Sequence, residues 1–121
     1  MSETEKSQLI RPVPKAALAA EVAAFLIDCQ ARQLSPRTLR FYHTELGLWC
    51  SWLGAQNAIS PLDITPDLLR GWLVHLQATR NPGGLHASYR SIRAFLNWYE
   101  NEYEPPGWTS PLRKLSPPRL S

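Results

Sequence analysis

The chain has 121 residues, a formal net charge of +3 and a hydrophobic content of 44%. This length and apolar content suffice for one folded domain with its own core, and the mild basic excess is compatible with a nucleic-acid partner. No apolar run approaches the roughly twenty residues that cross a membrane, and the polar start lacks the apolar core of a signal peptide. We therefore expect a cytoplasmic protein with no membrane partner.

The N-terminal part of the chain divides into an arm and a first helix. Residues 1–13 are mostly polar and are expected to form a flexible arm. A helix is predicted from about residue 14 to residue 33, because apolar residues recur at helical spacing among many alanines. Cys29 falls on this apolar stripe, and Cys50 lies near the apolar side of the next helix. Two cysteines are too few for a disulfide scaffold in so short a chain, so we expect buried free thiols.

The clearest helix signal covers residues 36–54. Ser35 is a good N-cap, and Pro36 suits the first helical position, where no backbone N–H is needed. Apolar residues then recur at steps of three and four and define one buried face: Leu39, Tyr42, Leu46, Trp49 and Leu53. Arg37 and Arg40 lie in the first turn, where cations oppose the helix dipole. A negatively charged partner would offset that cost, so this helix start is a first indication of a polyanionic ligand.

Two further helices are predicted in the second half of the chain. After a short connector, Thr65 caps a third helix that has Pro66 at its first position. The sequence Asn-Pro-Gly-Gly at 81–84 then predicts a break. A fourth helix follows from about residue 85 to residue 103, with apolar residues in phase along one side.

Residues 105–121 are rich in proline and basic side chains, and they are typical of an extended linker. A short extra helix is predicted near residues 111–115. No strand pattern competes with the helical periodicity. The expected fold is therefore all-α, a bundle of four to five helices spanning residues 14–104, followed by the linker.

The fourth predicted helix carries a polar stripe opposite its apolar side: His86, Arg90, Arg93 and Asn97. With Arg37 and Arg40 this stripe would form one basic surface if the second and fourth helices lie side by side, an arrangement suited to duplex DNA. The alternative is the ordinary polar outer face of any helix in water. Gly83 and Gly84 either let the backbone approach a phosphate or simply form a turn.

The sequence offers little for catalysis, cofactors or metals. The three histidines fall on three different predicted helices, and no ligand spacing typical of a metal site accompanies them. No nucleophile elbow, phosphate loop or paired-carboxylate signature occurs. We expect Trp52, Trp72 and Trp98 to belong to the core, whereas Trp108 is left unassigned. No cofactor and no metal site are expected.

The order of these patterns resembles a known family. The succession Leu34-Ser-Pro-Arg-Thr-Leu-x-x-Tyr42, then Leu46-x-x-Trp49-x-x-Trp52-Leu53, is similar to the start of the core-binding domain of tyrosine recombinases, the phage integrase and Xer-type family. Residues 64–69, Ile-Thr-Pro-Asp-Leu-Leu, resemble the segment that opens the third helix of that domain. Residues 86–99 resemble its last helix, and the proline-rich tail resembles its linker.

The resemblance implies a SAM-like orthogonal bundle that packs on one side of recombination-site DNA, with a separate catalytic domain on the other side. The second and fourth helices of that bundle lie across the major groove. Carried onto this chain, the implied DNA-binding residues are Ser35, Arg37, Thr38, Arg40, Gly84, His86, Arg90 and Arg93, followed by Arg113 and Lys114 in the linker. The implied partners are double-stranded DNA, the catalytic domain of the parent recombinase and, through residues 15–30, neighbouring protomers on DNA.

The chemistry of the family uses an Arg, Lys, His-x-x-Arg and Tyr set in the catalytic domain, and no His-x-x-Arg occurs here. We therefore expect this chain to bind DNA for integration or recombination without cutting it: an excised domain, a truncated product or a stand-alone binder. The alternative is a helical bundle that docks another protein and does not bind DNA. Arginines scattered over several faces of the bundle would favour that alternative.

Overall fold

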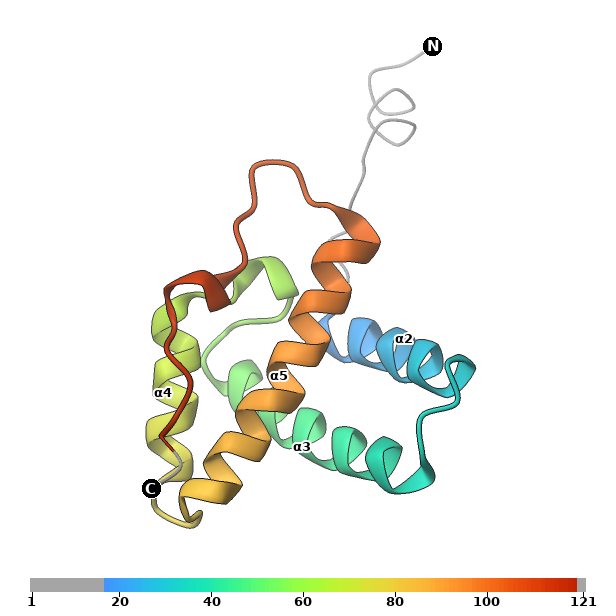
Figure 1. Cartoon of the computed structure of the whole chain (residues 1–121). Coiled ribbons are helices and arrows are strands. Elements are labelled where there is room, and N and C mark those ends of the chain that lie inside the picture. The colour runs from blue at the N-terminus through green and yellow to red at the C-terminus, as the bar shows by residue number, and fades with distance from the viewer. Residues whose placement is uncertain (1–16, 120–121) are drawn as a thin grey trace.

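The computed structural model describes residues 17–119, and this part of the chain is helical and contains no strand (Figure 1). Its elements are α2 (Leu18–Ala31), α3 (Pro36–Ala55), the 3₁₀ turn η1 (Pro61–Asp63), α4 (Pro66–Leu76), α5 (Pro82–Tyr103) and the 3₁₀ turn η2 (Pro111–Lys114). The expected all-α bundle is thus confirmed. The predicted arm at 1–13, and the first residues of the predicted first helix, lie outside the described residues.

The start of α5 corrects the predicted break at residues 81–84. The helix begins at Pro82, and both glycines lie inside its first turn. The reason is the cap: the Asn81 side chain accepts a hydrogen bond from the Gly84 backbone N–H at 2.8 Å, which satisfies a donor that a helix start leaves open. The asparagine and proline that looked like a break are a cap and a first helical residue.

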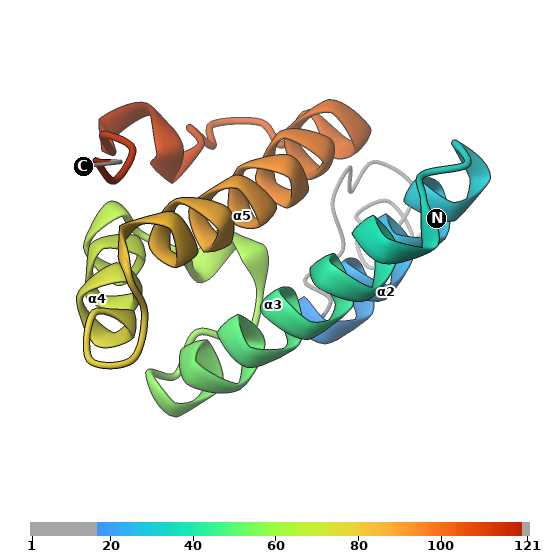
Figure 2. The ribbon, with the colours of Figure 1, turned by 60° about the horizontal axis from the view of Figure 1, so that its bottom comes forward.

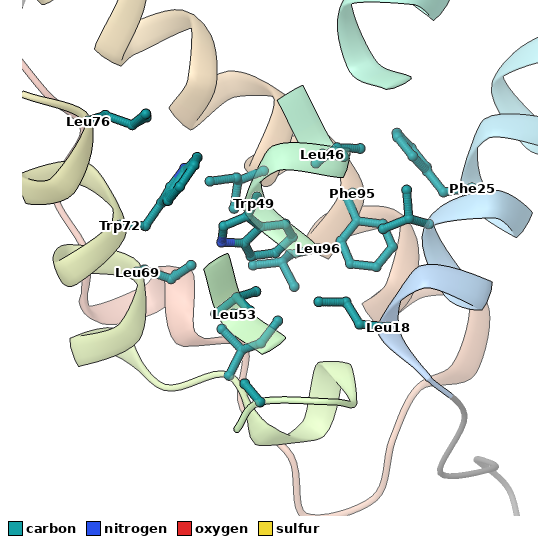
Figure 3. Packing of buried hydrophobic residues seen from close by; sticks show 14 of the residues in the cluster. Leu18, Phe25, Leu46, Trp49, Leu53, Leu69, Trp72, Leu76, Phe95 and Leu96 are labelled. Carbon is teal, nitrogen blue, oxygen red and sulfur yellow. The ribbon is translucent and has the colours of Figure 1, made fainter. Parts of the chain in front are cut away.

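Helix α3 forms the centre of the bundle, and α2, α4 and α5 all pack against it. Figure 2 shows α3 and α5 crossing the view diagonally, with α4 on one side of them and α2 on the other. Trp49 of α3 is fully buried at the middle of the core, and its ring centroid lies 5.9 Å from that of Phe95 on α5 (Figure 3). Large apolar side chains from four helices thus share one core, which supplies most of the driving force for folding.

Helix α4 approaches α3 closely at a glycine. A Cβ on Gly71 would lie 3.1 Å from the tip of the Trp52 ring, so this position favours the smallest residue. Trp72 beside it is buried and donates a hydrogen bond from Nε1 to Ser88 Oγ of α5 at 3.1 Å. Trp52 and Trp98 are half-buried and pack against the core. The assignment of these three tryptophans to the core is confirmed.

The tail folds back on the bundle. Its 3₁₀ turn η2 lies against α4 (Figure 1), and the short helix predicted near 111–115 is confirmed. The Arg70 side chain of α4 donates from Nη2 to the Lys114 backbone carbonyl at 2.8 Å. Trp108 packs edge-on against Tyr99, with 5.5 Å between ring centroids. The tail therefore contacts both α4 and α5, and a linker function for residues 105–119 stays a prediction.

Both cysteines are free thiols, as expected: Cys29 is fully buried and Cys50 is half-buried. Burial raises the pKa of the Cys50 thiol to about 11 and raises the pKa of Cys29. Both side chains are therefore protonated at neutral pH and act as small apolar residues, because the thiolate is the reactive form.

Two tyrosines of α5 give the fold a dependence on alkaline pH. Burial and then the Glu21 carboxylate raise the pKa of Tyr99 from 10.0 to about 12. A hydrogen bond to Glu21 is the largest cause that raises the pKa of Tyr103, also to about 12. The folded chain holds these phenolic protons more tightly than the unfolded chain, so the stabilisation is complete below pH 10 and is lost as pH rises toward 12.

In urea unfolding, we expect the free energy of unfolding to fall as pH rises from 10 toward 12. Tyr103→Phe should make the fall smaller, and an unchanged pH profile would contradict this account.

Candidate nucleic-acid interface

A groove of about 450 Å³ lies between the first half of α3 and residues 87–94 of α5. Three arginines line it, one from α3 and two from α5, together with one hydroxyl and four apolar or aromatic side chains: Arg37, Thr38, Phe41, Tyr42, Ala87, Arg90, Arg93 and Ala94. No carboxylate is among the lining residues. The groove thus combines three positive charges with an apolar lining, and such a surface attracts anions.

Local hydrogen bonds fix the α3 side of this groove. The Ser35 hydroxyl oxygen accepts the Thr38 backbone N–H at 3.2 Å, and the two hydroxyl oxygens lie 3.0 Å apart. The cap holds the first turn of α3 in place and therefore places Arg37 at the groove. The first turn of α3 contains no acidic residue, so nothing within it neutralises Arg37 or the positive end of the helix dipole.

The α5 side of the groove is an exposed basic ridge. Arg90 and Arg93 are exposed, and the Arg93 guanidinium carbon lies 5.7 Å from the centroid of the Tyr89 ring. This cation–π contact orients Arg93 without neutralising it. Among residues 17–119, Arg37, Arg90 and Arg93 form no ion pair, whereas Arg32, Arg70, Arg80 and Arg113 each have a carboxylate partner. Arg40 and Arg119 have no ion pair within this region either, so three of its five unpaired arginines meet at the groove.

Arg40 lies apart from these three arginines. It lines a second groove, between α2 and α3, with Leu26, Ile27 and His43 among its neighbours. The expected single surface of Arg37, Arg40 and the α5 arginines therefore holds for three of the four guanidinium groups. The reason is the helical rotation of three residues between positions 37 and 40, which carries Arg40 around α3 toward α2.

The start of α5 has no free Gly84 backbone N–H for a phosphate, although its glycines predicted a close backbone approach. The Gly84 N–H already donates to Asn81, and a Cβ on Gly84 would lie 3.3 Å from the Arg80 side chain. This backbone amide is therefore engaged, and the space beside it is filled. His86 is half-buried, and its ring centroid lies 6.2 Å from that of Tyr89. Neither Gly84 nor His86 lines the groove.

The two tail residues lie on the other side of α5. Arg113 lines a third groove, between α5 and η2, that also includes Arg93 and Asn97. An Arg113 nitrogen lies 3.7 Å from a Glu100 carboxylate oxygen, so its charge is partly compensated. Lys114 is exposed. Because Arg93 lines grooves on both sides, the α5 ridge connects Arg37 of α3 with Arg113 of η2.

Phe41 and the pair Glu45–Arg80 are not among the residues predicted from the sequence. Phe41 is an apolar residue out of phase with the buried face of α3, so the helical spacing itself predicts that its side chain is exposed. Arg80 donates two hydrogen bonds to Glu45, at 2.9 and 3.1 Å, across 35 positions of sequence. No local pattern predicts such a distant pair.

No family model, curated protein or solved structure matches this chain in comparisons with known proteins. Within residues 17–119, no three His, Cys, Asp or Glu side chains gather where a metal ion would bind. The helices of this same region are all too short or too polar to cross a membrane.

Proposed function

We propose that this chain is a DNA-binding domain of the tyrosine recombinase core-binding type, which grips duplex DNA through the groove between α3 and α5. The observation that carries the proposal is the convergence of Arg37, Arg90 and Arg93, unpaired among the described residues, on one groove without a carboxylate. A DNA duplex presents closely spaced phosphates, and three neighbouring guanidinium groups can neutralise several of them and release their counterions.

The remaining predicted contacts fit this arrangement to different degrees. Ser35 and Thr38 sit at the α3 end of the groove, where a hydroxyl can donate to a phosphate oxygen. His86 lies one turn before Arg90 on α5, and Arg113 and Lys114 extend the basic surface past the α5 ridge. Phosphate contacts would set the affinity, and base-edge contacts from the α5 ridge would set any sequence preference. We assign the cutting and joining of DNA to a separate catalytic domain, as the resemblance implies.

The rival proposal is a helical bundle that docks another protein. The observation that favours it is the α2–α3 groove, where Ile27 is 66% exposed beside Leu26 and Leu39. Exposed apolar side chains of this kind are common at protein interfaces, although a single one is also ordinary on a monomer. Arg40 lines this α2–α3 groove and not the α3–α5 groove, so the two proposals predict different effects for its removal.

The test is fluorescence anisotropy of a labelled mixed-sequence duplex, titrated with the protein at several salt concentrations. We expect the logarithm of the binding constant to fall linearly with the logarithm of salt, at about 0.9 per phosphate neutralised. Three arginines at one groove predict a slope of about −2.7 or steeper. No binding at low salt would reject the DNA proposal and would favour protein docking at the α2–α3 groove.

A further inference from the structure

Phe41 is an aromatic side chain in the α3–α5 groove that phosphate binding leaves without a role. It is 36% exposed, whereas Leu46, Trp49 and Leu53 on the buried face of the same helix are completely covered. Its ring centroid lies 6.4 Å from that of Tyr42, which in turn packs against Phe25 of α2 at 5.7 Å. Phe41 is thus supported from below by core aromatics and still presents surface to the groove.

The neighbours of Phe41 define what can bind there. Ala87 and Ala94 of α5 are small, so the opposite wall leaves room beside the Phe41 ring, and Arg37 and Arg90 contribute the charged lining. The groove volume of about 450 Å³ falls in the range of small-molecule sites, about 300–1,000 Å³. A ligand that matches both parts has a flat ring to stack on Phe41 and an anionic group for the arginines, which describes a nucleotide.

The same geometry requires that the nucleotide in the groove be unpaired. In a matched duplex the flat faces of the bases are covered by their neighbours, and a protein reaches only edges and phosphates. An aromatic side chain gains stacking energy only from a base that has left the stack, as in single-stranded DNA-binding grooves. We propose that the α3–α5 groove accepts one unpaired nucleotide of the bound DNA, with its base on Phe41 and its phosphates on the arginines. This inference rests on the proposed function, because it needs DNA at this groove.

Three labelled duplexes of the same sequence test the proposal by fluorescence anisotropy: a matched duplex, one with a single bulged adenine, and one with an abasic bulge. The abasic bulge has similar backbone flexibility but no base, so the difference between the two bulges isolates stacking. We expect the adenine bulge to bind about tenfold more tightly than the abasic bulge. Phe41→Leu should remove this difference, because leucine keeps an apolar side chain without the ring face.

Leu48→Ala is the matched control, because Leu48 is an apolar residue of α3, 48% exposed, that does not line this groove. It should keep the tenfold difference. Equal affinity of the two bulges overturns the proposal, and so does a difference that survives Phe41→Leu. A uniform loss with all three duplexes in Phe41→Leu would make Phe41 an ordinary duplex contact and would also overturn it. Failure to bind any of the three duplexes at low salt would instead reject the proposed function.

Discussion

Replacing Arg37, Arg90 and Arg93 together by alanine is expected to weaken duplex binding by roughly 10²–10³-fold at about 0.1 M salt. Each arginine that neutralises a phosphate contributes about 0.9 to the salt slope, so the triple variant should also lose about 2.7 of that slope. Both quantities come from one anisotropy series in which salt is varied. An unchanged affinity would exclude the α3–α5 groove as the DNA surface.

Two single variants give this experiment its controls. Arg32→Ala removes an arginine of equal charge whose Nε lies 2.9 Å from an Asp28 carboxylate oxygen, on an exposed part of the α2 end. Because that charge is already paired, we expect little change in affinity or slope. Arg40→Ala removes an exposed arginine of α3 that lines the α2–α3 groove. A loss as large as that of Arg90→Ala would extend the DNA surface around α3 to this second groove.

The helices were predictable because local chemistry determines their starts. Ser35 and Thr65 both cap helices as expected, and each side chain accepts a hydrogen bond from the N–H three residues later. The start of α5 was misplaced because Asn-Pro-Gly-Gly has the composition of a turn. There the cap bond from the Gly84 N–H outweighs the low helix propensity of two glycines.

The site was only partly predictable, because it depends on how two helices meet. Helical spacing placed Arg90 and Arg93 on one side of α5, and Arg37 at an exposed start of α3. Which of Arg37 and Arg40 faces α5 depends on the rotation of α3 about its own axis, which the core packing of Trp49 and Leu53 sets. The prolines of the tail exclude regular helix and so predict an extended segment, whereas in the structure Leu112 and Leu115 pack against the core.

Arg80→Ala is expected to destabilise the fold by about 3 kcal/mol, because it leaves a buried carboxylate without its partner. Glu45 on α3 is 7% exposed at its side chain and accepts both hydrogen bonds from Arg80, which precedes the Asn81 cap of α5. Glu45→Ala should cost less, about 1–2 kcal/mol, since the Arg80 side chain is 24% exposed and can turn to water. Urea unfolding followed by tryptophan fluorescence measures both. Equal decreases in the free energy of unfolding would mean that the Glu45 carboxylate also reaches water when Arg80 is replaced.

Arg32→Ala is the stability control for Arg80→Ala. It breaks an ion pair with Asp28 in which the side chains are 56% and 39% exposed, and it should lower the free energy of unfolding by less than about 1 kcal/mol. Folded Arg80→Ala protein keeps Arg37, Arg90 and Arg93, so its salt slope with duplex DNA should equal that of the unchanged chain, even though its free energy of unfolding is lower. A lower salt slope for Arg80→Ala would show instead that Arg80 leaves Glu45 and binds a phosphate when DNA is present. In that case the Glu45–Arg80 pair would act as a switch, and Glu45→Ala, which frees Arg80 permanently, would raise duplex affinity. An unchanged slope assigns Arg80 to holding the start of α5 against α3, and so to keeping the two sides of the groove in register.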